Sequence, residues 1–270
     1  MKCFLSIIIL SVLFCSRGAS VEALGIASVR QPGASLDISI RHEADNARRL
    51  AAEWLVARQL PDGSWGSTNA NTVLTPIVWF ALKGMDDAID AVARDRAVVW
   101  LDSQPMDASA PFDAHLWRLL MMRHAFPDAP ELQARAGLLL LAMKRHAPDA
   151  PAYSHWLWRE AEADPRTRPE PLAAAAQRQL DIVAPDYPLK TQNPETFWHF
   201  ARLINRYAGG VWVHGADALD WRNGFGLALI NAQRKDPSGG GCWNAPTDAP
   251  TDDAKLRATA FALLALREID

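Results

Sequence analysis

The sequence predicts an all-α protein built from about five stacked helix pairs. From Arg41 onward the apolar residues recur at three- and four-residue steps, as they do between Ala44 and Leu55, and this is the period of an α-helix. Ala and Leu dominate, whereas runs of Val, Ile and Thr are scarce, which disfavours strands. Turn signals rich in Pro, Asp and Gly divide the chain into about ten helices of roughly 12 to 18 residues.

The first 20 residues have the features of a secretory signal peptide. Lys2 supplies a positive charge, residues 3–14 form an uncharged, mostly apolar run, and the small residues Gly18 and Ser20 precede the expected cleavage point. No later apolar stretch approaches the roughly 18 residues that a transmembrane helix needs. We therefore expect an exported protein, periplasmic or secreted, with no transmembrane segment in the mature chain.

Cleavage at this point changes the charge and the cysteine count. Cleavage removes Lys2 and Arg17 but no acidic residue, so the net charge changes from −3 to −5. This negative charge argues against the excess of basic residues that binds nucleic acid. Of the 3 cysteines only Cys242 remains, so the mature chain forms no intrachain disulfide.

An alternative for the amino-terminal segment is a lipoprotein anchored at Cys15. Lipoprotein processing requires a small residue directly before the cysteine, and the bulky Phe14 at this position disfavours a lipid anchor at Cys15. Residues 21–40 lack helical periodicity and contain Pro-Gly, so we expect an extended leader before a repeat domain at 41–270.

Tryptophans mark a repeat of about 45 residues. The chain has 11 Trp, and Trp54 and Trp100 occupy the same position near the ends of two predicted helices. Because a helix pair of this kind cannot bury its apolar face alone, neighbouring pairs must stack. The stack is either a straight solenoid or a closed ring of inner and outer helices.

Two turns carry a distinctive pattern. In the segment from Gln59 to Gly66 the run Pro-Asp-Gly makes a tight turn, and Gly63 is free to adopt a positive φ. Trp65 can then fold back over the end of its helix, while Gln59 bonds the turn. A second copy with an insertion contains Gln233, Gly240 and Trp243.

These turns resemble the QW repeats of squalene–hopene cyclases and the related turns of protein prenyltransferase β subunits. Residues 72–82 and 259–263 resemble the inner helix that follows such a turn. The resemblance implies an α/α toroid of inner and outer helices, a fold also found in polysaccharide lyases and complement-type thioester domains. QW turns are structural clamps, so the resemblance implies fold more than chemistry.

Candidate ligand-binding residues lie on the predicted inner helices, where His and Arg three or four positions apart share one face. Indoles stack on sugar rings or shape apolar ligands, Arg pairs with carboxylate or phosphate, and His can act as a base. Alternatively, the Trp residues pack between helices and the His and Arg residues satisfy helix ends or surface acids. The candidates are His115, Trp117, Arg118, Trp156, Arg159, Trp198, His199 and Arg202, together with Trp79.

Asp252 and Asp253 are candidate catalytic acids. In the cyclases that the chain resembles, an Asp-x-Asp-Asp motif opens an inner helix and its third residue protonates the substrate. Asp252 falls on that position, but Pro250 replaces the first acid. The alternative is an ordinary helix start, where acidic side chains are favoured by free N–H groups and the helix dipole.

No cofactor or metal is predicted. The chain lacks CxxC, HExxH, GxSxG, Walker and Rossmann patterns. Gly240-Gly241 precede Cys242, which does not support the Asp-x-Cys zinc element of the prenyltransferases. The run from Asp86 to Asp90 has the letters of a magnesium–diphosphate motif, but an acid-rich first helical turn explains it equally well.

Three functions remain open. The first is a cyclase-like binder, or divergent enzyme, that holds an apolar terpenoid-type ligand in an aromatic central cavity. The second is a secreted polysaccharide lyase or glycan-binding toroid, with His155 and Tyr153 as base and acid and Arg159 as charge neutraliser. The third is a non-catalytic scaffold that binds another protein. The oligomeric state is likewise open.

Overall fold

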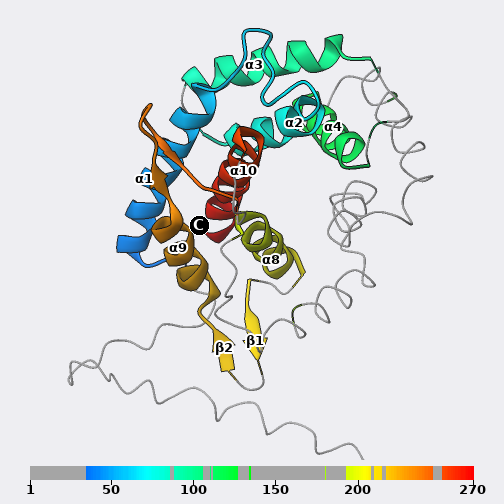
Figure 1. The fold of residues 1–270 in the computed structure, drawn as a ribbon. Helices are drawn as coiled ribbons and strands as arrows, with labels where there is room; N and C mark the ends of the chain where they lie inside the picture. Colours follow the sequence, from blue (N-terminus) through cyan, green and yellow to red (C-terminus); the bar gives the residue numbers. More distant parts are fainter. Residues whose placement is uncertain are drawn as a thin grey trace, which may run out of the picture. The chain divides into compact units, whose positions relative to one another are not determined.

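The computed structural model describes residues 35–85, 88–105, 112–126, 193–207, 210–214, 217–245 and 251–270, and the single residues 110, 134 and 180. They belong to one compact unit, 32–270. The predicted all-α class is confirmed, because these residues form seven helices and only two short antiparallel hairpins (Figure 1). The helices are α1 (Ile38–Val56), α2 (Asn71–Leu82), α3 (Ala88–Ser103), α4 (Phe112–Ala125), α8 (Pro194–Tyr207), α9 (Trp221–Ala232) and α10 (Asp252–Ile269). Strand β1 (Trp212–His214) pairs with β2 (Asp217–Leu219), and β3 (Arg234–Lys235) pairs with β4 (Gly241–Cys242).

Helix α10 lies at the centre of the described core. It packs against α8 on one side and α2 on the other, and α2 in turn packs against α4 (Figure 1). Every residue from Ala258 to Leu266 is buried. A helix that is buried all round needs apolar or small side chains on every face, and the Ala- and Leu-rich sequence of α10 supplies them.

Helix α1 begins at Ile38, slightly before the predicted start of the repeat domain. Leu36 is buried, and Asp37 is held by Asn223 of α9 through its backbone N–H at 3.0 Å and its carboxylate at 3.1 Å. The end of the predicted leader is therefore tied to α9. The predicted signal peptide and the rest of the leader lie outside the described residues.

The first of the two predicted turns, Gln59 to Gly66, joins α1 to α2 through Trp65. Its buried indole N–H donates to the carbonyl of Leu55 at 2.7 Å, and its backbone N–H donates to Thr75 Oγ1 at 3.0 Å. The second turn repeats both bonds between α9 and α10. Trp243 donates to the carbonyl of Leu229 at 2.8 Å and to Thr259 Oγ1 at 3.1 Å.

Each turn also attaches to a further helix. Gln59 Nε2 donates to the carbonyl of Gly63 within the turn at 2.9 Å and to that of Ala93 in α3 at 2.7 Å. Gln233 Nε2 donates to the carbonyl of Ala47 in α1 at 2.9 Å. The turn after α9 therefore holds α1 much as the turn after α1 holds α3.

Two glycines allow this close approach. Gly63 has φ +96°, and a Cβ there would lie 2.6 Å from the carbonyl oxygen of Arg96 in α3. Gly240 has φ +75°, and a Cβ there would lie 2.8 Å from the carbonyl oxygen of Leu50 in α1. Any larger residue would push either turn off its helix.

None of the helices in the described ranges has both the length and the apolar character needed to cross a bilayer. Two further helices of the repeat are predicted at about 131–146 and 171–183, and apart from Ala134 and Leu180, both helical, they lie outside the described residues.

Candidate functional site

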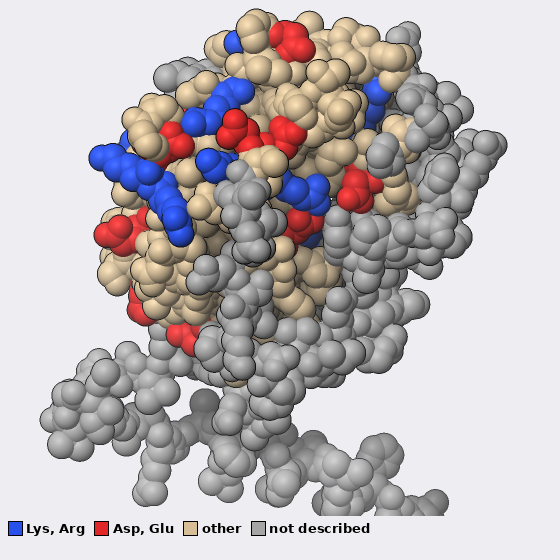
Figure 2. Space-filling model, viewed as in Figure 1, with Lys and Arg blue, Asp and Glu red and all other residues tan. Residues whose placement is uncertain are grey.

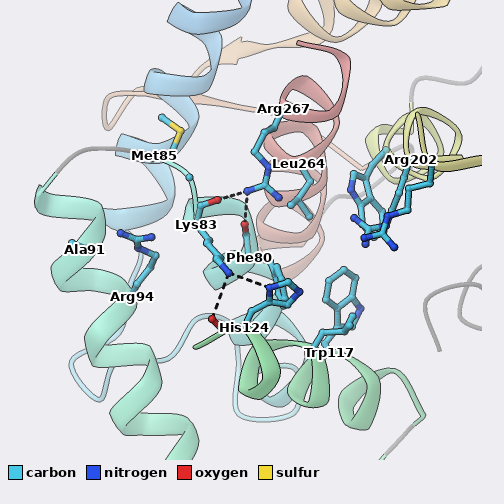
Figure 3. Close-up of a pocket in the computed structure, with 14 residues that line it drawn as sticks. Phe80, Lys83, Met85, Ala91, Arg94, Trp117, His124, Arg202, Leu264 and Arg267 are labelled. Carbon is cyan, nitrogen blue, oxygen red and sulfur yellow. Dashed lines mark hydrogen bonds between the residues drawn. The ribbon is translucent and has the colours of Figure 1, made fainter. Parts of the chain in front are cut away.

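A cavity of about 800 Å³ lies where the carboxyl-terminal halves of α2, α4, α8 and α10 meet the start of α3 (Figure 3). This volume suits a small organic ligand. The described residues that line it are Phe80, Lys83, Gly84, Met85, Ala91, Arg94, Trp117, Leu120, His124, Trp198, Arg202, Arg206, Leu264 and Arg267.

Aromatic rings form part of the cavity wall. The rings of Trp117 and Trp198 lie 5.6 Å apart, and Phe80 meets Trp117 edge-on at 6.0 Å. Phe261 of α10 contacts both indoles, at 5.8 and 5.2 Å, and is itself fully buried. Because Trp117 and Trp198 are only 1% and 3% exposed, the half-buried Phe80 is the ring of this group that a flat or apolar ligand can reach.

The cavity is also basic. Its described lining holds five Lys and Arg side chains and one His, but no Asp or Glu. On the face shown in Figure 2, by contrast, acidic and basic side chains are intermixed, and the whole chain has a net charge of −3. A basic cavity in an acidic protein is a local electrostatic feature that attracts anions.

Part of this charge serves the fold. Arg267 donates from Nη1 to the carbonyls of Phe80, at 3.1 Å, and of Lys83 at the end of α2, and Arg202 pairs with Glu268 at 3.2 Å. Cations at helix carboxyl termini are favoured by the free carbonyls and the helix dipole. Arg94 is not explained in this way, because it lies near the amino-terminal end of α3.

Lys83 and His124 form a bonded pair at the cavity. Lys83 Nζ lies 3.1 Å from His124 Nδ1 and 3.5 Å from the His124 carbonyl oxygen. Burial, followed by the charges of Arg267 and Arg94, lowers the pKa of the Lys83 ammonium. Burial, followed by Lys83 and Arg202, lowers the pKa of His124 to about 4. His124 is therefore neutral near pH 7, and its Nδ1 accepts a hydrogen bond from the Lys83 ammonium.

Three of the predicted ligand-binding residues line the cavity, namely Trp117, Trp198 and Arg202. Trp79 is buried beside it, with its ring 5.5 Å from Lys83 Nζ. His115, Arg118 and His199 do not line it. Arg118 instead donates to carbonyls at the end of α3, among them Gln104 at 2.8 Å and Leu101 at 3.3 Å. Tyr153, His155, Trp156 and Arg159 lie outside the described residues.

The predicted acids lie at the opposite end of α10. Asp252 begins the helix and is exposed, whereas the cavity meets this helix at Leu264, about 18 Å further along its axis. Thr251 caps the helix by accepting from the Ala254 N–H at 3.2 Å. Asp253 accepts from the backbone N–H and hydroxyl of Ser67, at 2.8 and 2.5 Å, and so ties α10 to the loop before α2.

Other candidates have structural surroundings. Burial raises the pKa of the Cys242 thiol, which makes it a poor nucleophile. Asp90, from the acidic run at the start of α3, is buried, and Asp86 and Asp87 lie outside the described residues. Within the described ranges no group of His, Cys, Asp and Glu is arranged to hold a metal ion.

Sequence reasoning missed most of the basic lining, that is Lys83, Arg94, His124, Arg206 and Arg267. Each is a single basic residue within or just beyond a helix, and the frequency of basic residues near helix carboxyl ends could have pointed to all of them except Arg94. No family model, no curated protein and no solved structure matches this chain.

Proposed function

We propose that this protein is an α/α toroid that binds an organic anion at one end of its inner helices. The arrangement α8–α10–α2–α4 supports the toroid, because alternate helices pack in succession and the last of them, α10, contacts the first, α2. The bond from Gln233 to α1 links the end of the repeat domain to its start. In a straight solenoid the last repeat would lie far from the first.

The charge of the cavity carries the ligand assignment. Five basic side chains with no acid among the described lining favour a carboxylate or phosphate. The half-buried ring of Phe80 favours a flat or apolar group attached to that anion. The proposed ligand is therefore an aromatic or otherwise ring-bearing acid.

The assignment of an anionic ligand favours some of the three functions predicted from the sequence over others. A neutral terpenoid would desolvate the basic side chains without forming any charged contact with them, which is unfavourable. An acidic sugar is the second candidate, because a sugar ring can pack on the half-buried Phe80 while its uronate pairs with Arg94. A scaffold would not need the cavity. The signal-like first 20 residues support an encounter with the ligand outside the cytoplasm.

Isothermal titration with phenyllactate, its neutral amide, trigalacturonate and squalene tests the proposal. We expect the acid to bind at least about tenfold more tightly than the amide, and added salt to weaken its binding. Arg94→Gln should weaken phenyllactate binding about 10- to 100-fold, the value of a charged hydrogen bond. Arg234→Gln, on the exposed strand β3, is the matched control and should leave binding unchanged.

Equal affinity for the acid and its amide would refute an anion site. Tighter binding of squalene than of either acid would favour the cyclase-like alternative. Tighter binding of trigalacturonate than of phenyllactate would identify an acidic glycan as the ligand.

A further inference from the structure

Lys83 has unusual surroundings for a lysine. Its amine bonds the imidazole and carbonyl of His124, and none of the described acidic side chains pairs with it. The charges that act on it belong to Arg267 and Arg94. Figure 3 shows the Lys83 side chain reaching the cavity between Arg94 and His124, with Arg267 near the end of α2.

These surroundings favour the neutral amine. Neighbouring cations and partial burial both disfavour the ammonium form, and a neutral lysine is a nucleophile. The neutral His124 accepts an N–H from the ammonium and from the amine alike, so the bond orients Nζ in both states. A lysine that served only as a positive charge would gain nothing from such neighbours.

We propose that Lys83 Nζ forms an imine with the carbonyl group of a bound α-keto or aldehyde acid. The nitrogen lone pair attacks the carbonyl carbon, and the carbonyl oxygen takes up a proton to give a carbinolamine. Loss of that hydroxyl with the remaining N–H proton releases water and leaves a C=N bond. Amine and carbonyl thus become imine and water, without oxidant or reductant.

The arrangement of charges suits an α-keto acid in particular. Its carboxylate is one bond from the carbonyl carbon, so cations directly beside Nζ can hold it while the amine attacks. Arg94 and Arg267 line the same cavity and their charges act on Lys83, so a carboxylate bound near Nζ would be attracted by both. This inference rests on the proposed function, because the same basic cavity must bind the acid.

Reductive trapping tests the inference on the full chain. The protein is incubated with phenylpyruvate and sodium cyanoborohydride, and the peptides are mapped by mass spectrometry. We expect Lys83 to gain the mass of the keto acid less one oxygen atom. Its labelling near neutral pH should be clearly faster than that of Lys235 or Lys255, because a lowered pKa leaves more of the Lys83 amine in its free form.

Two variants and one competitor complete the design. Lys83→Arg removes the nucleophilic amine and should abolish the selective label, while phenyllactate binding falls by about tenfold at most. Lys235→Arg, in the exposed strand β3, should keep the label at Lys83. Phenyllactate carries a hydroxyl in place of the ketone, so it should compete with labelling but form no adduct.

The outcomes separate the two proposals. If phenyllactate binds but Lys83 reacts no faster than Lys235, the imine is refuted and the anion site stands. If neither binding nor selective labelling is seen, both are refuted. Selective labelling that phenyllactate does not slow would keep the reactive lysine and refute the anion site.

Discussion

Replacing Gly240 by Ala should destabilise the protein much more than replacing Gly239, its neighbour in the same turn. Both glycines have positive φ, +75° for Gly240 and +104° for Gly239. A Cβ on Gly239 would meet no atom within 4 Å. A Cβ on Gly240 would lie 2.8 Å from the Leu50 carbonyl oxygen and 2.9 Å from Trp54 Cβ, both in α1.

The expected magnitudes follow from these contacts. A positive φ costs an alanine roughly 1–2 kcal/mol, and this term applies to both variants. Overpacking against the backbone of α1 adds roughly 1–3 kcal/mol for Gly240→Ala alone. The free energy of unfolding should therefore fall by about 2–5 kcal/mol for Gly240→Ala and by about 1–2 kcal/mol for Gly239→Ala.

Urea unfolding of both variants measures this difference, and thermal unfolding should separate them by about 2–4 °C for each kcal/mol. Combining Gly240→Ala with Gln233→Ala should give less than the sum of the two effects, because both remove the same attachment to α1. Equal losses for Gly239→Ala and Gly240→Ala would refute docking of this turn on α1, and with it the closure of the ring.

Three further predictions concern single side chains. Trp65→Phe, and likewise Trp243→Phe, removes an indole N–H from a buried carbonyl and should lower the free energy of unfolding by roughly 1–3 kcal/mol in urea. Burial lowers the pKa of His124 from 6.5 to about 4 in the folded protein. Between pH 6.5 and pH 4 the unfolded chain therefore binds more protons than the folded protein, so the free energy of unfolding should fall as the pH falls through this window. His124→Asn should flatten that part of the unfolding profile measured against pH. Asp253→Asn should lower stability by about 1 kcal/mol yet leave phenyllactate binding unchanged by calorimetry, and a loss of binding would place this acid in the ligand site.

The turns are the part of the structure that local sequence best predicts. Gln59, Gly63 and Trp65 lie within seven residues, and the bonds of Gln59 to the turn and of Trp65 to Leu55 depend mainly on the local fold. The α-helical class likewise follows from a short-range period. The partners across the turn, Ala93 and Ala47, could be identified only once helices distant in sequence were placed together.

The cavity shows the limit of such reasoning. The helical period predicted that Trp117 and Arg118, or Trp198 and Arg202, lie on inner helices, but not which neighbour each side chain meets. Arg118 turns to the end of α3, while Arg202 reaches the cavity. Lys83, Arg94 and Arg267 have no common spacing, because they come from α2, α3 and α10 and meet only in the tertiary structure.

The direction of the helices explains why cations gather here. Most of the residues that line the cavity from α2, α4, α8 and α10 lie in the carboxyl-terminal halves of these helices, and the carbonyls of Phe80, Lys83 and His124 accept hydrogen bonds from cavity cations. These negative dipole ends stabilise basic side chains without any carboxylate. Arg267, bonded to two carbonyls of α2, illustrates the effect. A dipole end is equivalent to only about half a charge, so a full cation placed there retains positive potential. An arrangement that serves helix capping therefore leaves a residual attraction for anions, and Arg94, near the start of α3, adds to it.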